Sequence, residues 1–329
     1  MHPGAGNGTV LGGSSRALCD VYDGGLLDLD GVLYIGRAGV AHSADAVRAA
    51  RAGGMRIAFV TNNASRRPAA VAEHLVELGI PAQPTDVVTS AQAAVGYLAE
   101  QLPPGSAVLV VGTVGLAEEV AAGGLRPVRT VAAAGPGGPA AVVQGLDTTT
   151  SWRDLAEACI AIRAGALWVA GNTDSTYPSE RGPLPGNGAM VSALITATQR
   201  HPVVVGKPEP ALHQVSVDRV GAVRPLVVGD RLDTDVLGAV RAGSDSLLVL
   251  TGVTDRDALL AAPPGMRPTY VASDLRGLLV PHEAPRLEGD RARCGAATAS
   301  YDGTVIVTSG QGDDQLRASC ALAWSRADG

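Results

Sequence analysis

Two aspartates occupy alternate positions where an apolar run of the 329-residue sequence ends in glycine. They are Asp28 and Asp30, within residues 26–33 (LLDLDGVL). Because alternate residues of a strand share a face, we expect both carboxylates to emerge side by side at the strand's carboxyl edge, where open α/β sheets bind ligands. Adjacent carboxylates repel unless a cation or a proton neutralises them. The pair therefore indicates a metal or acid–base site, and the alternative is a solvent-exposed acidic turn.

A second apolar run ends in small hydrogen-bonding side chains. Thr61, Asn62 and Asn63 directly follow Phe59 and Val60. Such side chains, together with the backbone N–H groups that start the next helix, can donate to phosphate oxygens without carrying net charge. The same residues are also typical of an ordinary helix-capping loop, so this segment alone does not separate the two interpretations.

The only lysine of the chain, Lys207, also follows a β-branched run, in residues 203–208 (VVVGKP). The other 25 of the 26 basic residues are arginine, a bias that leaves lysine only where its chemistry is needed. A compact ammonium neutralises a phosphoryl group and the carboxylate that attacks it, whereas a planar guanidinium fits that geometry poorly. The alternative is a surface lysine. A Walker A phosphate loop is excluded, because His201 and Pro208 stand where that motif needs glycine and serine or threonine.

Acidic residues come directly after a further apolar run, in residues 227–235 (VVGDRLDTD). Magnesium takes oxygen ligands, usually one or two protein carboxylates together with water and substrate phosphate. Asp230 is therefore a candidate metal ligand, with Asp235 close to it in sequence. Asp233 and Asp235 could instead cap and charge-stabilise the following helix, and we expect this simpler role for Asp233.

These four segments are positioned by the elements around them, and the hydrophobic pattern predicts an α/β protein with a parallel sheet. Short runs rich in Val, Ile and Leu alternate with Ala-rich segments of helical period, as expected for parallel strands covered by helices on both faces. Strands are expected at residues 26–29, 56–61, 108–111, 141–144, 167–170, 203–205, 226–228, 247–250 and 269–272. Helices are expected at residues 43–52, 68–78, 91–101, 152–163, 189–198, 210–219 and 234–242.

The composition indicates a globular protein that needs local positive groups or a metal to bind an anion. With 46% hydrophobic residues and a net charge of −6, the chain can bury sizeable cores but does not attract nucleic acid or an anionic membrane over long range. Four widely spaced cysteines without a CxxC pair argue against a zinc site and a disulfide framework. No segment has the pattern of a signal peptide or a membrane span. We expect a cytoplasmic protein without nucleic-acid or membrane partners.

In this order, each at the end of a strand, the four segments resemble the motifs of the haloacid dehalogenase (HAD) superfamily. The wider context, in residues 60–66, 172–190 and 206–210, is similar to its nitrophenylphosphatase-like branch with a type IIA cap. Within that branch the chain resembles the actinobacterial glycerol 3-phosphate phosphatases. The resemblance spans about residues 18–279 and implies a Rossmann-like core with a parallel sheet, an inserted α/β cap and a small C-terminal appendage.

The domains that the resemblance implies are partly discontinuous. They are a flexible N-terminus at residues 1–17, a catalytic core at 18–87 and 203–283, a substrate-selecting cap at 88–202 and an appendage at 284–329. In the appendage we expect a hairpin through residues 298–308 and a short Ala-rich helix that ends near Trp324. A homodimer formed through the cap is a further expectation.

The resemblance also implies a mechanism. Asp28 would attack phosphorus as the nucleophile, and Asp30 would protonate the leaving alkoxide and then deprotonate the hydrolytic water. Magnesium would be held by the Asp28 carboxylate, the main-chain carbonyl of Asp30 and the Asp230 carboxylate, while Asp235 would orient this set.

The neutral and basic motifs receive their roles in the same way. Thr61 and Asn62 would hold phosphoryl oxygens, with Asn63 nearby, and Lys207 would offset charge during transfer. The expected substrate partner is therefore a small phosphorylated metabolite.

The polar segment at residues 171–188 (GNTDSTYPSERGPLPGNG) is the most informative part of the implied cap. Loops on rigid scaffolds often carry specificity, so Asp174, Tyr177, Arg181 and Asn187 are candidates for contacting a polar substrate tail. Equally, Glu180 and Arg181 could form a solvated ion pair, and the Pro-Gly-Asn-Gly run at residues 185–188 could be a turn that caps the next helix.

The expected function is magnesium-dependent hydrolysis of a small phosphomonoester through an aspartyl-phosphate, with glycerol 3-phosphate as the substrate that the resemblance favours. Phosphoglycolate, pyridoxal phosphate and nucleotides are alternative substrates. A phosphomutase shares the paired aspartates but returns phosphate to a sugar, and a regulatory or binding module that keeps the fold is an alternative of a different class. Release of free phosphate would separate the phosphatase from both.

Overall fold

The computed structural model describes residues 11–177 and 182–328, and these divide into two compact units. Unit 1 contains the described residues up to 60, residues 73–86 and those from 216 onward. Unit 2 contains residues 61–72 and 87–215. Each unit has a parallel sheet with helices in the connections, which confirms the predicted α/β fold class.

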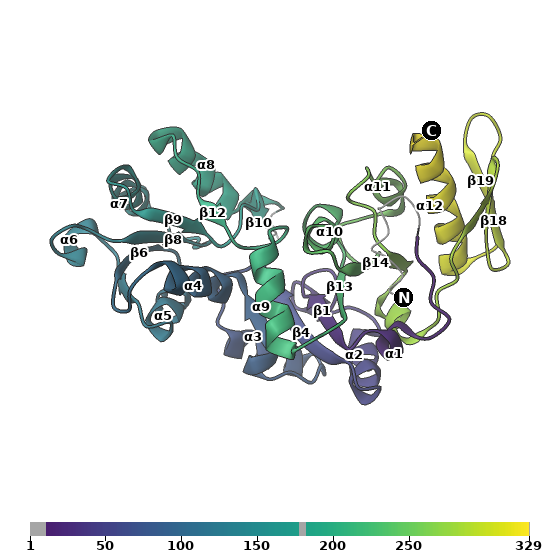
Figure 1. Ribbon diagram of the computed structural model, residues 1–329, viewed down its shortest axis with the longest axis horizontal. Helices are drawn as coiled ribbons and strands as arrows, with labels where there is room; N and C mark the ends of the chain where they lie inside the picture. Colours follow the sequence, from purple (N-terminus) through teal and green to yellow (C-terminus); the bar gives the residue numbers. More distant parts are fainter. Residues whose placement is uncertain (1–10, 178–181, 329) are drawn as a thin grey trace. The chain divides into compact units, whose positions relative to one another are not determined.

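The parallel strands of unit 1 run in the order β15, β14, β13, β1 and β4. The last four of them are labelled in Figure 1. These parallel strands are β1 (Gly24–Asp28), β4 (Arg56–Thr61), β13 (Pro225–Gly229), β14 (Asp245–Val249) and β15 (Tyr270–Ala272). Their apolar side chains are almost all buried, as expected where helices cover both faces of a sheet. In the register, Leu27 lies opposite Val228 on one side and Phe59 on the other.

The remaining elements of unit 1 are short. Its helices before the C-terminal region are α1 (Leu18–Val21), α2 (Ser43–Ala52), α10 (Leu237–Ala242) and α11 (Arg256–Leu260). A π-helical turn η2 (Leu232–Val236), 3-10 turns η1 (Pro84–Asp86) and η3 (Leu275–Leu279), and a hairpin of β2 (Tyr34–Ile35) and β3 (Ala38–Gly39) complete it. Helices α3 (Pro68–Glu77) and α9 (Pro210–Val220) contain residues assigned to both units.

Unit 2 is built on a second parallel sheet, in the order β12, β9, β8, β6 and β7. The strands of this sheet are β6 (Ala107–Val111), β7 (Arg126–Val128), β8 (Ala141–Gln144), β9 (Leu167–Ala170) and β12 (Val203–Val204). Unit 2 also contains β5 (Val87–Thr89), outside this sheet, and the antiparallel pair of β10 (Thr176–Tyr177) and β11 (Leu184–Pro185). Its helices are α4 (Ser90–Gln101), α5 (Val114–Ala122), α6 (Val131–Ala134), α7 (Trp152–Arg163) and α8 (Asn187–Thr198). Capping boxes at Thr89 and Ser151 fix where α4 and α7 begin.

The second sheet includes β12, whose residues the sequence places in the catalytic core. Val203 pairs with Val169 and Val204 with Ala170, so the chain leaves this sheet only after residue 204. The sequence predicts that the cap ends and the core resumes at residue 203. The contacts within the structure instead group residues up to 215 with unit 2, and the functional division stays a prediction.

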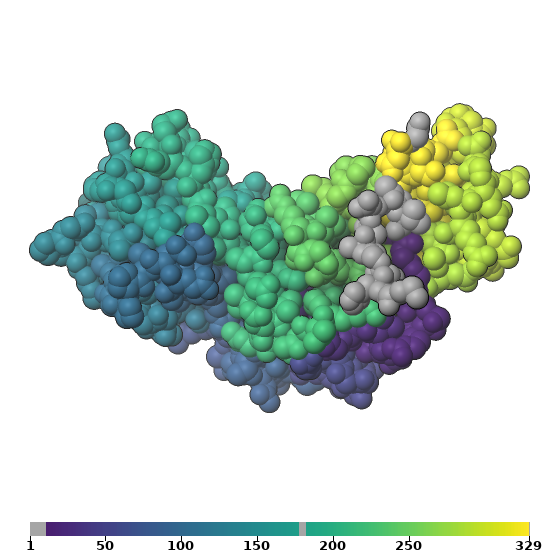
Figure 2. Space-filling model, in the orientation of Figure 1, coloured from purple at the N-terminus to yellow at the C-terminus, as the bar shows by residue number. Residues whose placement is uncertain are grey.

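Residues 286–328 form a C-terminal module of unit 1, with an antiparallel sheet and one long helix. The strands are β16 (Arg286–Glu288), β17 (Arg291–Cys294), β18 (Ala297–Tyr301) and β19 (Ile306–Ser309), and the helix is α12 (Gly312–Asp328). Figure 1 shows α12 beside β18 and β19, and Figure 2 shows the module as the yellow and yellow-green part of the surface. The predicted hairpin is therefore part of a larger sheet, and the helix continues past Trp324.

Helix α12 is buried on both sides, more deeply than its modest apolar content predicts. Leu316, Cys320 and Trp324 pack with Leu248 and Val271 of the parallel sheet. Ala318, Ala321 and Leu322 pack against the antiparallel strands. The Trp324 indole N–H donates to the Leu259 carbonyl at 3.1 Å.

Part of the segment that the sequence predicts to be a flexible N-terminus is bound to unit 1. Leu11 is buried in the same core as Trp324. The backbone N–H of Gly12 donates to the Thr269 carbonyl, and that of Ser14 to the His282 carbonyl. Residues 1–10 lie outside the described part of the chain. One buried apolar side chain and three backbone hydrogen bonds, the third from the His282 N–H to the Ser14 carbonyl, hold the described part of this Gly- and Ser-rich segment against unit 1.

Most predicted elements agree with the structure within one or two residues at either end. Two differences concern the site, because β1 ends at Asp28 and α10 begins only at Leu237. Strand β7 was missed because it contains Pro127, which is typical of an edge strand. Among the described residues, no helix combines the length and the apolar character needed to cross a membrane.

Candidate active site

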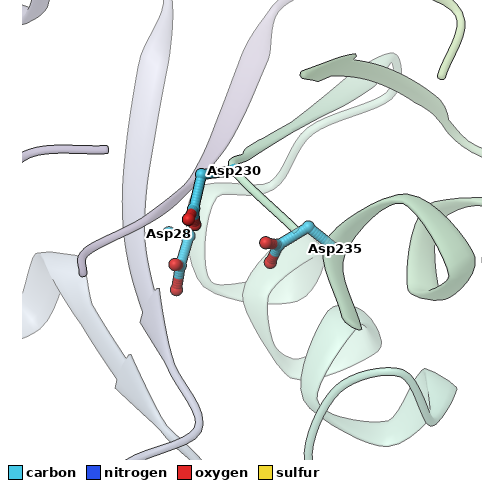
Figure 3. A group of neighbouring side chains, drawn as sticks. All are labelled: Asp28, Asp230 and Asp235. Atoms are coloured by element: carbon cyan, nitrogen blue, oxygen red, sulfur yellow. The ribbon is translucent and has the colours of Figure 1, made fainter. Parts of the chain in front are cut away.

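Three carboxylates converge at the carboxyl end of the unit 1 sheet (Figure 3). Asp28 is the last residue of β1, Asp230 follows β13 and Asp235 lies in η2. Each contributes one oxygen to a group whose members all lie within 4.8 Å of one another. Asp230 and Asp235 are buried and Asp28 is half-buried, so the group is largely shielded from bulk water.

The strand register explains why Asp28 and Asp230 meet. Leu27 is opposite Val228 in the parallel pair, and β13 ends one residue later at Gly229. The two aspartates therefore leave neighbouring strands at nearly the same level. Parallel strands bring their carboxyl ends to one edge of the sheet, which is the ligand-binding edge of such folds.

Asp235 reaches the same place because the chain winds into a π-helical turn before α10. The backbone N–H groups of Asp235 and Val236 both donate to the Arg231 carbonyl at 3.2 Å. Turns of this kind are rare and occur frequently at functional sites. The sequence predicts an α-helix from residue 234, and the extra residue in this turn is what directs Asp235 toward the other two carboxylates (Figure 3).

Backbone amides hold two of these carboxylates in fixed orientations. The N–H of Val253 donates to Asp230 Oδ2 at 2.6 Å, and the N–H of Thr254 donates to the Asp230 carbonyl. The N–H of Arg231 donates to Asp235 Oδ2 at 3.2 Å. These backbone donors fix the direction in which each carboxylate points.

Two glycines make room for the Asp230 carboxylate. A Cβ atom at Gly31 or Gly252 would overlap the Asp230 side chain, and at Gly252 it would also lie 2.8 Å from the Gly31 Cα. Gly31 has in addition a φ of +86°, in the left-handed region that favours glycine. The backbone at both glycines therefore packs directly against the Asp230 carboxylate.

This group of residues fits a divalent cation that prefers oxygen ligands. Converging carboxylates raise one another's free energy when buried, and a cation between them removes that repulsion. All the clustered side-chain donors are carboxylate oxygens, which suit Mg²⁺ and Ca²⁺ better than softer metals. The carboxylate oxygens and the glycines that pack against Asp230 support the predicted magnesium site.

Within the part of the chain that the structure describes, Asp30 is not one of the three clustered carboxylates. The sequence predicts that Asp28 and Asp30 share one face of a strand, but β1 ends at Asp28 and Asp30 is exposed in the following turn. There it forms an isolated bridge with Tyr34, and the N–H of Gly31 donates to the Tyr34 carbonyl at 2.8 Å. The positive φ of Gly31 turns the chain here, which ends the strand periodicity. Its acid–base role stays a prediction.

Asp233 forms a surface ion pair in place of the helix-capping role that the sequence predicts for it. It pairs with the Arg231 guanidinium, with 2.8 Å between Nη2 and Oδ2, and its side chain is mostly exposed. It is not one of the clustered carboxylates among the described residues.

In unit 2, Lys207 is held by its backbone. The Lys207 N–H donates to Asn62 Oδ1 at 2.7 Å, and Asn62 Nδ2 donates to the Lys207 carbonyl at 3.0 Å. The side-chain amide of Asn62 thus binds both the N–H and the carbonyl of Lys207. The sequence assigns the Asn62 side chain to phosphoryl oxygens, and the structure instead engages it with the backbone of the lysine.

The neighbouring residues of the Thr-Asn-Asn segment form a turn. Asn63 Oδ1 accepts from both the N–H and the hydroxyl of Ser65, at 2.8 and 2.5 Å. Thr61, buried at the end of β4, accepts the Asn63 N–H on its hydroxyl at 3.1 Å. Asn63 therefore has the capping-loop geometry that the sequence left open as an alternative.

The candidates for substrate contact in the cap differ in exposure. Asp174 lies within 3.4 Å of Asn62 Nδ2 through both carboxylate oxygens, and Tyr177 is half-buried at the end of β10. Asn187 is 1% exposed at the start of α8, with its Nδ2 on the Asn172 carbonyl at 2.7 Å. The structure thus gives Asn187 an internal contact where the sequence predicts a substrate contact. Arg181 lies outside the described residues.

Sequence reasoning missed two contributors to these arrangements. Gly252 and the Val253 amide sit just after β14, and a glycine that closely follows a predicted strand was the available signal. Asn172 donates from Nδ2 to the Asn62 carbonyl at 2.7 Å, and its position directly after the predicted strand at residues 167–170 gave a comparable signal.

Family models match both halves of the predicted catalytic core. Residues 25–126 match a model described as haloacid dehalogenase-like hydrolase, and residues 204–278 match a second, HAD-hydrolase-like model. Two curated relatives cover most of the chain. The D-glycerol 3-phosphate phosphatase of Mycobacterium tuberculosis is 54% identical over 266 residues, which are 80% of this chain and 72% of the relative. The 5′-nucleotidase YutF of Bacillus subtilis is 38% identical over 240 residues, 72% of this chain and 90% of the relative.

A solved structure extends this similarity to the fold. The crystal structure of a glycerol phosphate phosphatase from Mycobacterium tuberculosis in complex with magnesium superposes with a TM-score of 0.83 at 47% identity. It covers 94% of this chain, and this chain covers 92% of it. The resemblance drawn from the four motifs is confirmed, and the chain belongs to the haloacid dehalogenase-like hydrolases.

Proposed function

We propose that this protein is a magnesium-dependent phosphomonoesterase that hydrolyses glycerol 3-phosphate through an aspartyl-phosphate on Asp28. The observation that carries the proposal is the convergence of Asp28, Asp230 and Asp235 at the carboxyl edge of a parallel sheet. The substrate rests on the 54% identity to a D-glycerol 3-phosphate phosphatase.

The reaction proceeds in two displacements at phosphorus. A carboxylate oxygen of Asp28 forms a bond to phosphorus while the ester P–O bond breaks, and Asp30 donates a proton to the departing alkoxide. Water then attacks the same phosphorus, and Asp30 accepts its proton as the aspartyl P–O bond breaks. Phosphate leaves and both aspartates return to their starting states. The exposed turn that carries Asp30 is consistent with proton exchange between turnovers.

The metal would be held by the Asp28 carboxylate, the Asp30 main-chain carbonyl and the Asp230 carboxylate, with Asp235 beside them. Bound magnesium neutralises these converging carboxylates and draws charge from the phosphoryl oxygens. The Val253 amide keeps the Asp230 carboxylate in one orientation. The Arg231 amide does the same for Asp235.

Neutral donors and one cation would bind the phosphoryl group. We assign this role to the Thr61 hydroxyl, which can still donate while it accepts the Asn63 N–H, to the backbone N–H of Asn62, with Asn63 nearby, and to the Lys207 ammonium. The ammonium offsets the charge that gathers on the phosphoryl oxygens as the nucleophile approaches.

The substrate's alcohol would be selected by the cap at residues 88–202. Asp174 and Tyr177 are the described candidates, since both lie in the polar loop that follows β9, and we include Arg181 from the sequence.

We further propose that the protein is cytoplasmic and that it forms a homodimer through the cap. A measurement of its mass in solution would test the dimer.

A phosphate-release screen with Mg²⁺ tests the proposal. Glycerol 3-phosphate, phosphoglycolate, pyridoxal phosphate and nucleoside monophosphates are compared at equal concentration, with EDTA replacing Mg²⁺ as the control. We expect kcat/KM for glycerol 3-phosphate to exceed the others by at least about tenfold, a ratio that a few polar contacts supply.

Each contrary outcome overturns a different part of the proposal. A preference for nucleotides would move the substrate toward that of the nucleotidase relative. Isomerised sugar phosphate without release of phosphate would indicate a phosphomutase. No turnover of any ester with Mg²⁺ would leave a binding module.

A further inference from the structure

Three asparagine side chains of unit 2 form a series of hydrogen bonds that ends at the backbone of Lys207. We propose that Asn172 and Asn187 are positioning residues that fix Lys207 through Asn62. The inference rests on the proposed function in one respect, since it treats Lys207 as the phosphoryl-binding cation.

Each amide in the series donates to the backbone carbonyl of the next member. Asn187 Nδ2 donates to the Asn172 carbonyl at 2.7 Å, and Asn172 Nδ2 donates to the Asn62 carbonyl at 2.7 Å. Asn62 Nδ2 then donates to the Lys207 carbonyl at 3.0 Å. The series therefore joins the start of α8, the segment after β9, the end of β4 and the segment after β12.

Burial makes these bonds hard to exchange for others. Asn172 is 4% exposed and Asn187 is 1% exposed, so a lost partner would leave a buried amide without water to replace it. The Asn62 carbonyl is also bound by the Ser90 hydroxyl at 2.6 Å. Two donors on one carbonyl fix the direction of the Asn62 peptide, from which its side chain reaches Lys207.

Close backbone packing prevents the lysine segment from sliding. A Cβ atom at Gly206 would overlap both the Gly171 carbonyl and Asn62 Oδ1. A Cβ atom at Gly188 would overlap the Thr173 carbonyl. The segments that carry the series are thus in direct backbone contact where glycine is present, and a shift at one of them has to move the next.

Fixing the lysine backbone matters because its side chain is long and flexible. The ammonium stands at the end of a four-carbon stem, so anchoring the peptide at both N–H and C=O limits where the ammonium can lie. A displacement of about 1 Å at a catalytic group can lower a rate by about 100-fold. Residues that never touch substrate can therefore set the rate through Lys207.

The single lysine of the chain provides a direct test. The full-length protein is labelled with [¹⁵N]lysine, so its amide spectrum contains one cross-peak, that of Lys207, whose N–H donates to Asn62 Oδ1. Asn62→Ala, Asn172→Ala and Asn187→Ala should each shift this cross-peak and speed its hydrogen exchange, with the largest effect for Asn62→Ala. Thr196→Ala is the matched control, because it removes an exposed side-chain bond to the Ser192 carbonyl in the same helix as Asn187. It should leave the cross-peak in place.

Steady-state kinetics provide a second test. Asn187→Ala should lower kcat by roughly 10- to 100-fold with little change in KM, because it displaces Lys207 without touching substrate. In a Lys207→Arg background the same change should have a smaller effect, since residues that act through one group are not additive. Should Asn187→Ala fail to fold in a thermal melt, Asn187→Ser replaces it, as serine is well tolerated at a helix start and its shorter side chain shortens the reach to Asn172.

An unmoved Lys207 cross-peak in folded Asn172→Ala and Asn187→Ala would overturn the inference, as would equal kinetic effects in both backgrounds. The spectra are recorded without substrate. If the phosphatase proposal fails, the cross-peak measurement still stands, and if only the positioning inference fails, phosphate release by the unaltered protein is unaffected.

Discussion

Acidic side chains gather in two regions of unit 1, and their surroundings are opposite in kind. At the sheet edge, Asp28, Asp230 and Asp235 converge within 4.8 Å of one another. In the C-terminal module, acids of α12 instead meet arginines. Asp328 binds the Arg267 guanidinium through two bonds of 2.5 and 2.8 Å, and Asp314 binds Arg317 at 2.9 Å.

The difference separates a site built for chemistry from one built for stability. Like charges held together by the fold disfavour the folded state until a cation binds, whereas opposite charges in contact favour it. Removing an acid from the sheet edge should abolish activity while the protein stays folded. Removing an acid from the module should lower stability and leave activity unchanged.

The largest expected effect is that of Asp28→Asn, which removes the proposed nucleophile and one of the three converging carboxylates. Turnover should fall by roughly 10⁴-fold or more, the scale seen when a covalent nucleophile is lost. The thermal midpoint in EDTA should stay close to that of the unaltered protein, since the variant keeps the fold. Phosphate release with Mg²⁺ and circular dichroism melts measure the two quantities.

Asp328→Asn is the matched control for that experiment, because it makes the same chemical change in the paired region. It should keep the turnover of the unaltered protein. Near-normal turnover by Asp28→Asn would remove the nucleophile assignment and with it the contrast between the two regions.

A smaller effect on activity should follow from Gly252→Ala. The added Cβ would overlap the Asp230 carboxylate and displace it from its place beside Asp28, while every metal-binding group remains. The Mg²⁺ concentration for half-maximal phosphate release should rise by about 10- to 100-fold, the usual range for changes around a metal ligand. Calorimetric titration with Mg²⁺ should show the same loss of affinity without substrate.

Gly96→Ala controls for the change from glycine to alanine. Gly96 lies within α4, where an added Cβ meets nothing within 4 Å, so alanine should favour the helix slightly and leave Mg²⁺ binding unaltered. Equal Mg²⁺ titrations for Gly252→Ala and the unaltered protein would show that the glycine does not shape the metal site.

The acidic site could be largely predicted because its signal is local. Asp28 and Asp230 each follow an apolar run, and parallel strands necessarily end at one edge. The place of Asp235 could not be predicted in detail, since it depends on five residues winding as a π-helical turn where the period favours an α-helix. Asp30 shows the complementary limit, because the strand periodicity that linked it to Asp28 stops at the Gly31 turn.

The neutral contacts of unit 2 were beyond the reach of sequence patterns. Asn62 and Lys207 are 145 positions apart, and an asparagine beside a strand end gives no sign of which distant carbonyl it will bind. The same reason explains Asn187, which the polar composition of its loop assigned to substrate but which the fold buries against Asn172. Fold class and charged groups follow from local pattern, whereas hydrogen bonds between distant loops require the three-dimensional structure.

The smallest expected effect, confined to stability, is that of Asp328→Asn, and its pH dependence tests why the module's acids are there. Hydrogen bonds from Arg267 hold the pKa of Asp328 below its usual value. A carboxylate with a lowered folded-state pKa stabilises the fold above its ordinary pKa of about 4 and loses that contribution as pH falls through the folded value. The Arg267 side chain is only 1% exposed, so removing its partner's charge leaves a buried cation with weaker compensation.

Asp328→Asn should therefore melt at a lower temperature than the unaltered protein at pH 7, and the difference should shrink as pH falls below about 4. Asp290→Asn is the matched comparison, since Asp290 pairs with Arg326 at 2.8 Å but is 77% exposed, and solvent screens such pairs. Its effect should be smaller at every pH. A difference in melting temperature that stays constant for Asp328→Asn down to pH 3 would mean that the charge of Asp328 does not contribute to holding the end of α12 at Arg267. The contrast with the sheet edge would then have no electrostatic basis.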